Sequence, residues 1–187
     1  EFLTGPEVSV LSFTDGNVVI PMVSSMDHKR AKDGDEGLNT GGMGTVAPNP
    51  YYTDDVAKEC MEKIFIPTIE AMKKEGRTFK GCLYFGLMLT PKGPKVIEYN
   101  CRFGDPETQV VLPLLESDLL EIMQATTNGT LSEDLVKWKS VLRKQGAFFI
   151  QMYELGVYIR ILRKSHIFFV FSLKKFKKVL KYVKRYD

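Results

Sequence analysis

The hydrophobic positions along the chain predict two β-hairpins. Residues 7–13 (EVSVLSF) and 17–23 (NVVIPMV) are rich in β-branched and apolar side chains, and Thr14-Asp15-Gly16 joins them. Asp-Gly between two apolar runs is typical of a hairpin of antiparallel strands. Residues 79–90 and 95–100 repeat this arrangement around the turn PKGP. We predict a second hairpin there, with both strands apolar enough to be buried.

Between the two hairpins, the apolar residues follow a helical period. They recur every three or four residues from Val56 to Met72, which predicts an amphipathic helix. Thr53 is the expected N-cap, two aspartates follow it in the first turn, and the helix should end by Gly76. Pro67 lies inside this helix and removes one hydrogen-bond donor, so we expect a kink there.

The remaining pattern completes the expected fold. Residues 107–117 (ETQVVLPLLES) and 117–129 (SDLLEIMQATTNG) predict two further helices. Residues 24–50 hold many glycines and prolines and form a loop too long for a simple connection, so we expect it to be functional or disordered. The order β-β-loop-α-β-β-α-α, without internal repeats, indicates an α+β fold in which helices flank an antiparallel sheet.

The charge of the chain divides it into two segments. Residues 1–140 hold 14 Lys and Arg against 21 Asp and Glu, whereas residues 141–187 hold 12 against 2. Lysines and apolar residues alternate at helical spacing over residues 173–183, as in a basic amphipathic helix that binds nucleic acid or a membrane surface. We predict a domain over residues 1–139 and a divergent basic and aromatic tail, expected to be helical, over residues 140–187.

The cysteines and the longest apolar run limit the classes of protein. Cys60, Cys82 and Cys101 are too few and too scattered for a disulfide framework or a thiolate metal site. Glu154 and Arg160 interrupt the apolar part of the tail before it reaches the ~20 residues of a membrane-spanning helix. We therefore expect a cytoplasmic protein with no membrane and no nucleic acid among its partners.

The polar segment EYNCRFGDPETQ, which begins at the end of the last predicted strand and continues beyond it, carries the most specific chemistry. Glu98 and Asn100 are two residues apart, so on a strand their side chains point to one face, about 6–7 Å apart. A carboxylate and an amide oxygen suit Mg²⁺ or Mn²⁺, and the alternative is an ion pair of Glu98 with a lysine at the sheet end. Arg102 could neutralise phosphate charge beside the metal, or form a surface ion pair with Asp105 or Glu107.

The long loop carries a second group of candidate residues. It joins a cationic cluster, His28-Lys29-Arg30, to a glycine cluster at residues 41–44. Glycines let backbone amides approach a substrate closely, and Lys and Arg attract phosphate or carboxylate groups. The loop contains neither GxxxxGK[ST] nor GxGxxG, so this pattern alone is weak. Glu7 could accept two ribose hydroxyls, or it could be an exposed acid at a strand edge.

Three segments together resemble one known family. They are EFLTGPEVSV, DHKRAKDGDEGLNTGGMGTVAPNP and VIEYNCRFGDPETQVVLPLLESDLLEI. They resemble the C-terminal half of the ATP-grasp core of the phosphoribosylamine–glycine ligase family, and RFGDPETQ is highly specific to that family. The resemblance extends from residue 1 to about residue 139, and it implies an ATP-grasp C-terminal subdomain there.

The resemblance also implies roles for individual residues. Glu98 and Asn100 match the family's Mg²⁺ or Mn²⁺ ligands, Phe2 and Leu3 match the hinge that contacts adenine, and Glu7 matches the ribose ligand. Many ATP-grasp enzymes carry a further acidic metal ligand on the preceding strand, but CLYFGLMLT contains no acid. The residues on the substrate and phosphate side are Asp27, Lys29, Asn39, Thr40, Gly41, Gly42, Gly44, Asp105 and Glu107, with Arg102 in the catalytic role.

The activity that the resemblance implies is an ATP-dependent ligation in purine biosynthesis. The carboxylate of glycine forms a glycyl phosphate with ATP, and the amine of 5-phosphoribosylamine then displaces phosphate to form the amide. In the family, an N-terminal domain and the rest of the ATP-grasp core precede this segment. We therefore interpret the chain as a fragment, inactive alone, that could pair with a separate N-terminal half. The alternatives are a non-catalytic nucleotide- and metal-binding module, and a tail that binds nucleic acid or membrane.

Overall fold

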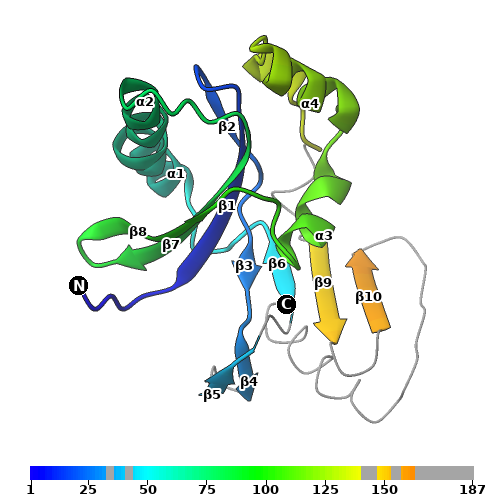
Figure 1. Ribbon diagram of the computed structural model, residues 1–187. Coiled ribbons are helices and arrows are strands. Elements are labelled where there is room, and N and C mark those ends of the chain that lie inside the picture. The colour runs from blue at the N-terminus through cyan, green and yellow to red at the C-terminus, as the bar shows by residue number, and fades with distance from the viewer. Residues whose placement is uncertain (33–35, 41–43, 140–146, 153–156, 163–187) are drawn as a thin grey trace.

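The computed structural model describes residues 1–32, 36–40 and 44–139, together with the backbone of two strands at residues 147–152 and 157–162 (Figure 1). The predicted basic helix over residues 173–183 lies outside the described residues. All three cysteines lie inside them and are free thiols, as expected. No helix in the described part is long and apolar enough to cross a membrane.

The centre of the molecule is a four-stranded antiparallel sheet in the order β2-β1-β7-β8. It consists of β1 (Glu7–Thr14), β2 (Val19–Pro21), β7 (Gly81–Thr90) and β8 (Gly93–Asn100). Both predicted hairpins are confirmed. Asp15 stabilises the first turn, because its carboxylate accepts hydrogen bonds from the backbone amides of Asn17 and Val18 at 2.9 and 3.0 Å.

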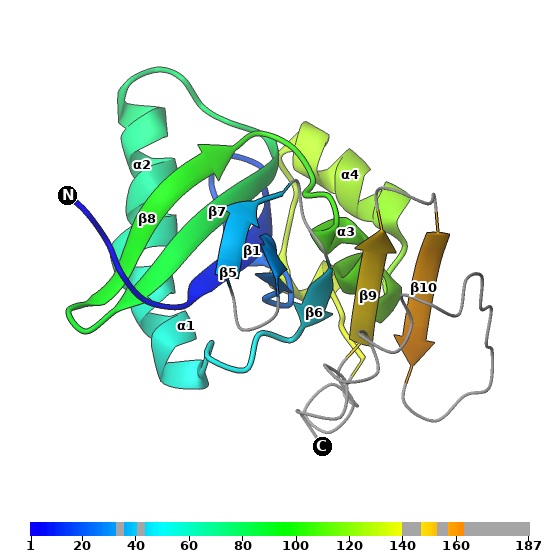
Figure 2. The same ribbon diagram turned by 90° about the horizontal axis from the view of Figure 1, so that it is seen from below.

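One face of this sheet is covered by the first helical segment (Figures 1 and 2). It contains α1 (Asp54–Cys60), a π-helical turn (Met61–Phe65) and α2 (Ile66–Lys74). Thr53 is the N-cap, as predicted, and its side chain accepts a hydrogen bond from the amide of Val56. The expected kink at Pro67 takes the form of the π turn that directly precedes α2. The side chain of Thr68 donates to the carbonyl of Ile64 at 2.6 Å, which satisfies an acceptor near the proline.

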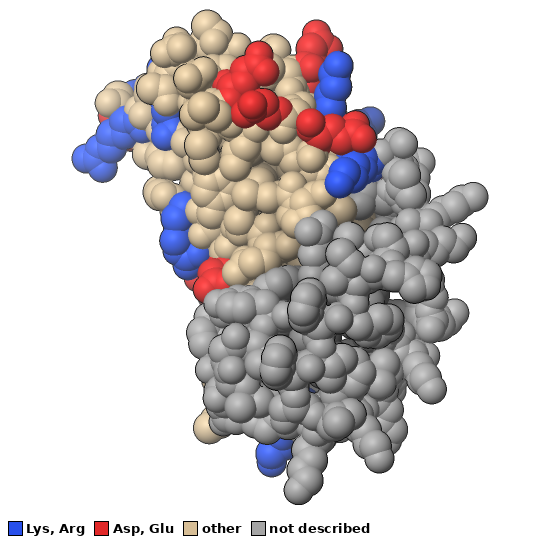
Figure 3. All heavy atoms as spheres, turned by 90° about the vertical axis from the view of Figure 1, so that its right-hand side faces the viewer, with Lys and Arg blue, Asp and Glu red and all other residues tan. Residues whose placement is uncertain are grey.

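The opposite face of the sheet packs against the two later helices (Figure 2). These are α3 (Glu107–Val111), continued by a 3₁₀ turn (Leu112–Leu114), and α4 (Leu119–Asn128). Asp118 caps the start of α4, and Gly129 ends it with a positive φ of 77°. A further 3₁₀ turn spans Glu133–Leu135. On the side of α3 and α4, charged side chains lie toward the edges of the described surface, and the surface between them is largely uncharged (Figure 3).

The predicted loop over residues 24–50 is more regular than expected. It contains β3 (Met26–Asp27), β4 (Arg30–Lys32), β5 (Glu36–Asn39) and β6 (Thr45–Ala47). The strands β4 and β5 form a hairpin that projects from the body of the molecule (Figure 1). Backbone hydrogen bonds between short polar strands form this hairpin, and such strands carry no periodic hydrophobic signal.

A second sheet, in the order β10-β9-β6-β3, includes part of the tail. It adds β9 (Ala147–Met152) and β10 (Val157–Leu162), and β9 pairs antiparallel with β6. The expectation of a helical tail is therefore wrong for these two segments, whose β-branched and aromatic residues favour strands. The division of the chain at residue 140 stays a prediction.

The face of the central sheet that packs against α1 and α2 holds its own hydrophobic core. Phe65 is completely buried, and its ring centroid lies 4.3 Å from that of Phe85 on β7. Truncation to alanine would remove this ring and leave a cavity between helix and sheet. We predict that Phe65→Ala lowers the free energy of unfolding by about 3–5 kcal/mol, measured by urea denaturation.

The neighbouring residue provides a matched control. Ile66 is 42% exposed, so Ile66→Ala should cost less than about 1 kcal/mol. Equal losses for the two variants would contradict the assignment of Phe65 to the core.

Candidate active site

Strand pairing places the candidate metal ligands on one face of the central sheet. Directly paired residues of antiparallel strands project to the same face. Glu98 on β8 pairs with Gly86 on β7, which pairs in turn with Ser9 on β1, and the next row joins Asn100 to Tyr84. Glu98 and Asn100 therefore share a face, as their spacing predicts, and this face is opposite to the one that packs against α1 and α2.

A β-bulge decides which face the pair occupies. Val96 pairs with Leu87 and Glu98 pairs with Gly86, so Ile97 is an extra residue in β8. Without this extra residue, Glu98 would be aligned with Phe85 and would point to the core under the helices. The prediction that β8 is buried is wrong, because Ile97 and Tyr99 are 47% and 49% exposed on this edge strand.

Gly86 provides the space into which the Glu98 side chain extends. A Cβ atom at position 86 would lie 2.8 Å from Cγ of Glu98 and 3.3 Å from Cε1 of Tyr84. Any larger residue would therefore displace the Glu98 side chain from its position over β7. Among the described residues, no hydrogen bond or ion pair holds the Glu98 carboxylate, so the predicted alternative of a lysine partner is not found.

The same face lines an open cavity of about 210 Å³. Four of the predicted site residues line it: Glu7, Lys29, Asn39 and Glu98. They come from β1, β5, β8 and the segment between β3 and β4, so the cavity brings together residues that are far apart in the sequence. Ser9, Tyr84 and Gly86 line it as well, and the sequence analysis did not identify them. The only feature of the sequence that could have indicated these three residues is that they are small or polar and stand at alternate positions of apolar strands.

Lys29 and Glu7 form an ion pair across the cavity. Nζ of Lys29 donates to Oε2 of Glu7 at 3.1 Å, and both side chains are partly exposed. Burial alone would lower the pKa of Lys29, but the hydrogen bond to Glu7 and the charges of Glu7, Asp27 and Glu98 outweigh it and raise the pKa. Glu7 is exposed at the first position of β1, so its assignment as ribose ligand and the alternative of an exposed acid at the strand end both stay predictions.

A buried carboxylate lies beneath the cavity. Glu107 is only 4% exposed, and its Oε1 accepts hydrogen bonds from Tyr84 at 3.0 Å and from Ser9 at 3.2 Å. Burial and the adjacent Glu107 charge raise the pKa of the Tyr84 hydroxyl, which therefore stays a donor. Glu107 does not pair with Arg102 at the surface, and its buried network fixes α3 to β1 and β7.

Asp27 belongs to the same acidic neighbourhood. Burial raises the pKa of Asp27 to about 7, and the charges of Glu107, Glu7 and Asp105 act in the same direction against the opposing charge of Lys29. Near neutral pH this side chain is therefore divided between its protonated and ionised forms.

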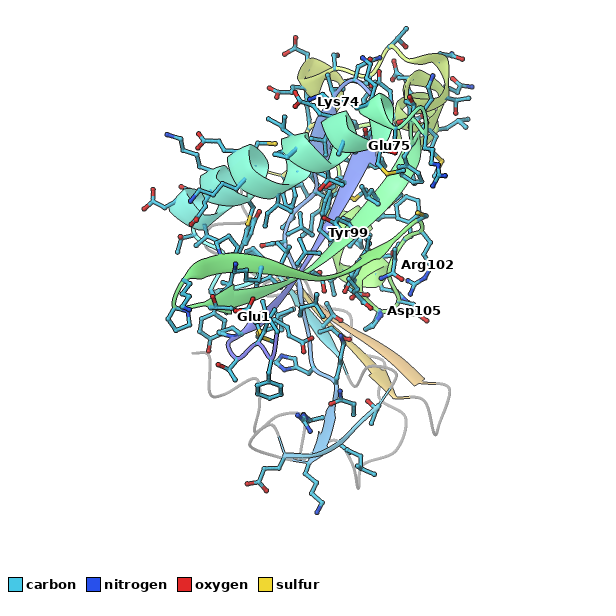
Figure 4. The ribbon with its side chains drawn as sticks, turned by 60° about the vertical axis from the view of Figure 1, so that its left-hand side comes forward. Glu1, Lys74, Glu75, Tyr99, Arg102 and Asp105 are labelled. Carbon is cyan, nitrogen blue, oxygen red and sulfur yellow. The ribbon has the colours of Figure 1, made fainter. Side chains whose placement is uncertain are left out.

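The remaining predicted residues do not line the cavity. Arg102 and Asp105 lie near each other beyond the end of β8 (Figure 4), and Arg102 donates to the carbonyl of Phe103 at 2.9 Å. Phe2 is 92% exposed, and Leu3 is partly buried. The side chain of Thr40 donates to the carbonyl of Lys29 at 2.8 Å, and the carbonyl of Gly44 accepts from the amide of His28. Gly41 and Gly42 lie outside the described residues.

Comparisons of the chain with a family model and with individual known proteins agree on one family. The family described as phosphoribosylglycinamide synthetase, ATP-grasp (A) domain, matches residues 1–108. The chain is 55% identical over 138 residues to the trifunctional purine biosynthetic protein adenosine-3 of Gallus gallus, covering 74% of this chain and 14% of that protein. It is 52% identical over 139 residues to a phosphoribosylamine–glycine ligase of Caldanaerobacter subterraneus, covering 74% of this chain and 33% of that protein.

A solved structure agrees with these relatives. The crystal structure of phosphoribosylamine–glycine ligase from Thermotoga maritima superposes with a TM-score of 0.68 at 33% identity, covering 80% of this chain and 36% of that one. The chain thus spans about a third or less of the length of these proteins.

The raised pKa of Asp27 generates a prediction about stability. The ordinary pKa of 3.8 applies when the chain is unfolded, so between pH 4 and pH 7 the folded state binds more protons. The free energy of unfolding must therefore fall as pH rises through this window. Asp27→Asn cannot ionise, so its stability relative to the wild type should rise from pH 5 to pH 7.5 by on the order of 1 kcal/mol, after allowance for solvent screening.

Thermal unfolding at both pH values would measure this difference. Glu116→Gln is the matched control, because it removes one acid from an exposed position. A difference between Asp27→Asn and the wild type that does not change with pH would show that Asp27 titrates normally.

Proposed function

The chain belongs to the phosphoribosylglycinamide synthetase ATP-grasp (A) domain family, and from this membership we propose that it forms part of an ATP-dependent carboxylate–amine ligase. The proposed reaction joins glycine to 5-phosphoribosylamine in de novo purine biosynthesis. The observation that carries the proposal is the cavity on one sheet face, where Glu7, Lys29 and Glu98 meet around unobstructed space.

The two candidate metal ligands suit Mg²⁺ or Mn²⁺. Their donor set is one carboxylate and one amide oxygen on a single sheet face, and the Glu98 carboxylate has no competing protein partner among the described residues. A bound divalent cation would neutralise charge on the phosphates of ATP. Glu98 and Asn100 would supply two of its ligands, and phosphate oxygens and water would complete the shell.

The other residues suit the binding and orientation of substrates. Glu7 would accept the ribose hydroxyls of ATP, and Phe2 and Leu3 would contact its adenine. Lys29, released from Glu7 when the ribose binds, would attract a phosphate or carboxylate group. Arg102, which is exposed beyond the end of β8, would neutralise charge on the transferred phosphoryl group.

The substrate side of the site has a corresponding assignment. Asp27, the segment from Asn39 to Gly44, Asp105 and Glu107 would surround glycine and phosphoribosylamine. A glycine carboxylate oxygen would attack the γ-phosphorus of ATP, which releases ADP and gives a glycyl phosphate. The amine of phosphoribosylamine would then attack the carbonyl carbon, the C–O bond to phosphate would break, and the amide would form.

This assignment predicts that divalent metal binding depends on Glu98. We expect the chain to bind Mn²⁺ in the presence of ATP, and Glu98→Ala to weaken this binding at least about tenfold, because one of two protein ligands is lost. Electron paramagnetic resonance of free Mn²⁺ measures the binding directly.

The control is Glu70→Ala, which removes an exposed carboxylate from α2 on the other side of the sheet. Equal Mn²⁺ affinity in Glu98→Ala and Glu70→Ala would remove the metal assignment. Binding of Mn²⁺ without any effect of ATP would instead favour a metal-binding module over a ligase site.

A further inference from the structure

Lys29 is the one cationic side chain among the described residues that line the cavity. Two carboxylates line it as well, those of Glu7 and Glu98. An anionic ligand that enters the cavity would therefore draw its compensating side-chain charge from Lys29. This charge is already engaged, because Nζ of Lys29 donates to Oε2 of Glu7 at 3.1 Å. The ion pair thus withholds the cation from an anion.

The backbone on both sides of this ion pair is fixed. Glu7 is paired with Met88 of β7, and its carbonyl accepts a hydrogen bond from the side-chain amide of Asn49 at 3.1 Å. The carbonyl of Lys29 accepts from the backbone amide and from the hydroxyl of Thr40, at 2.7 and 2.8 Å. Both side chains of the pair are partly exposed. The pair can therefore open by rotation of side chains alone, while the strands stay in place.

The ammonium group of Lys29 stays charged after the pair opens. The ordinary pKa of a lysine lies well above neutral pH. Burial lowers the pKa of Lys29, but the charges of Asp27 and Glu98 favour its protonated form even without the hydrogen bond to Glu7. Opening of the pair therefore changes the partner of the cation and not its charge.

A vicinal diol is a neutral ligand that suits Glu7. Its two O–H groups can donate to the two oxygens of one carboxylate, and one of these oxygens is Oε2, the acceptor of Lys29. A diol in this position also occupies the space beside Glu7 in which the ammonium group lies. Because the diol carries no charge, it takes the acceptor without competing for the cation.

We propose that Glu7 and Lys29 form a switch that makes the binding of a vicinal diol and the binding of an anionic group cooperative. The diol binds to Glu7 and releases Lys29, and the released ammonium group binds a phosphate or carboxylate group in the same cavity. The assignment of the diol as the ribose of a nucleotide rests on the proposed function, in which the anion belongs to a second substrate. The nucleotide thus prepares the cavity for that substrate.

The cooperativity is reciprocal and modest. A ligand that raises the affinity of a second ligand gains the same factor in return. The factor is limited by the free energy of the ion pair that opens, and a partly exposed pair contributes little to stability. We therefore expect each ligand to tighten the binding of the other by about two- to fivefold.

Adenosine and inorganic phosphate are probes that carry the two groups on separate molecules. Amide shifts in ¹H–¹⁵N spectra of the full chain would measure the Kd of each probe. We expect saturating adenosine to lower the Kd of phosphate by about two- to fivefold. 2′,3′-Dideoxyadenosine, which lacks both hydroxyls, should leave the Kd of phosphate unchanged. A repeat with acetate distinguishes a phosphate from a carboxylate as the coupled anion.

Two variants test the switch itself. Glu7→Gln leaves Lys29 without its ionic partner, so it should bind phosphate about two- to fivefold more tightly without adenosine, and adenosine should add no further gain. Lys29→Gln should bind phosphate more weakly, and adenosine should no longer change that affinity. Glu70→Gln and Lys74→Gln change exposed charges on α2, so these matched controls should couple the two probes as the wild type does.

The proposal is overturned if adenosine leaves the Kd of both phosphate and acetate unchanged, if dideoxyadenosine acts as adenosine does, or if Lys29→Gln retains the cooperativity. If adenosine binding weakens in Glu7→Gln but the wild type shows no cooperativity, only this inference falls and the ribose assignment stands. Equal adenosine affinity in the wild type and in Glu7→Gln would remove both. The dependence of Mn²⁺ binding on Glu98 tests the proposed function separately from these outcomes.

Discussion

The geometry of the candidate site depends on the register of β8 relative to β7. The central sheet has one face packed under α1 and α2 and another that borders the cavity, and each strand must divide its side chains between them. The bulge at Ile97 shifts the last residues of β8 by one position, so Glu98 pairs with Gly86 and faces the cavity. Gly86 then leaves room for the Glu98 side chain, and the carboxylate reaches the cavity with no hydrogen bond or ion pair to any residue that the structure describes.

Electrostatics divides the cavity into two regions of different character. At its open edge, Glu98 is exposed, and Lys29 pairs with Glu7 in contact with solvent. Beneath it, Glu107 is buried in a hydrogen-bond network, and the pKa of Asp27 rises to about 7. In the proposed function, a divalent cation with phosphates would bind in the first region. In the proposed reaction, phosphoryl transfer would take place at the open edge, and the amino acid would bind beneath it.

Local signals in the sequence predict much of this fold. The Asp-Gly turn predicts the first hairpin, and Thr53 and Gly129 mark the ends of helices, because turns and caps depend on neighbouring residues. The shared face of Glu98 and Asn100 follows from strand periodicity. The bulge that determines which face they share cannot be predicted from this periodicity, because it arises from the pairing of β8 with β7. The partnership of Asp27 with Thr45 and the burial of Glu107 also arise from contacts between distant segments, so no local pattern announces them.

The central claim is that Glu98 and Asn100 jointly bind a divalent metal at the open edge of the cavity. Anomalous diffraction from crystals of the chain grown with Mn²⁺ and ATP tests it most directly, because the manganese signal locates the ion without assumption. The account predicts a manganese peak within coordination distance of Glu98 and Asn100, on the Gly86 side of β8. A peak at Asp27 and Glu107, or a Glu98 side chain turned toward α2, would contradict it.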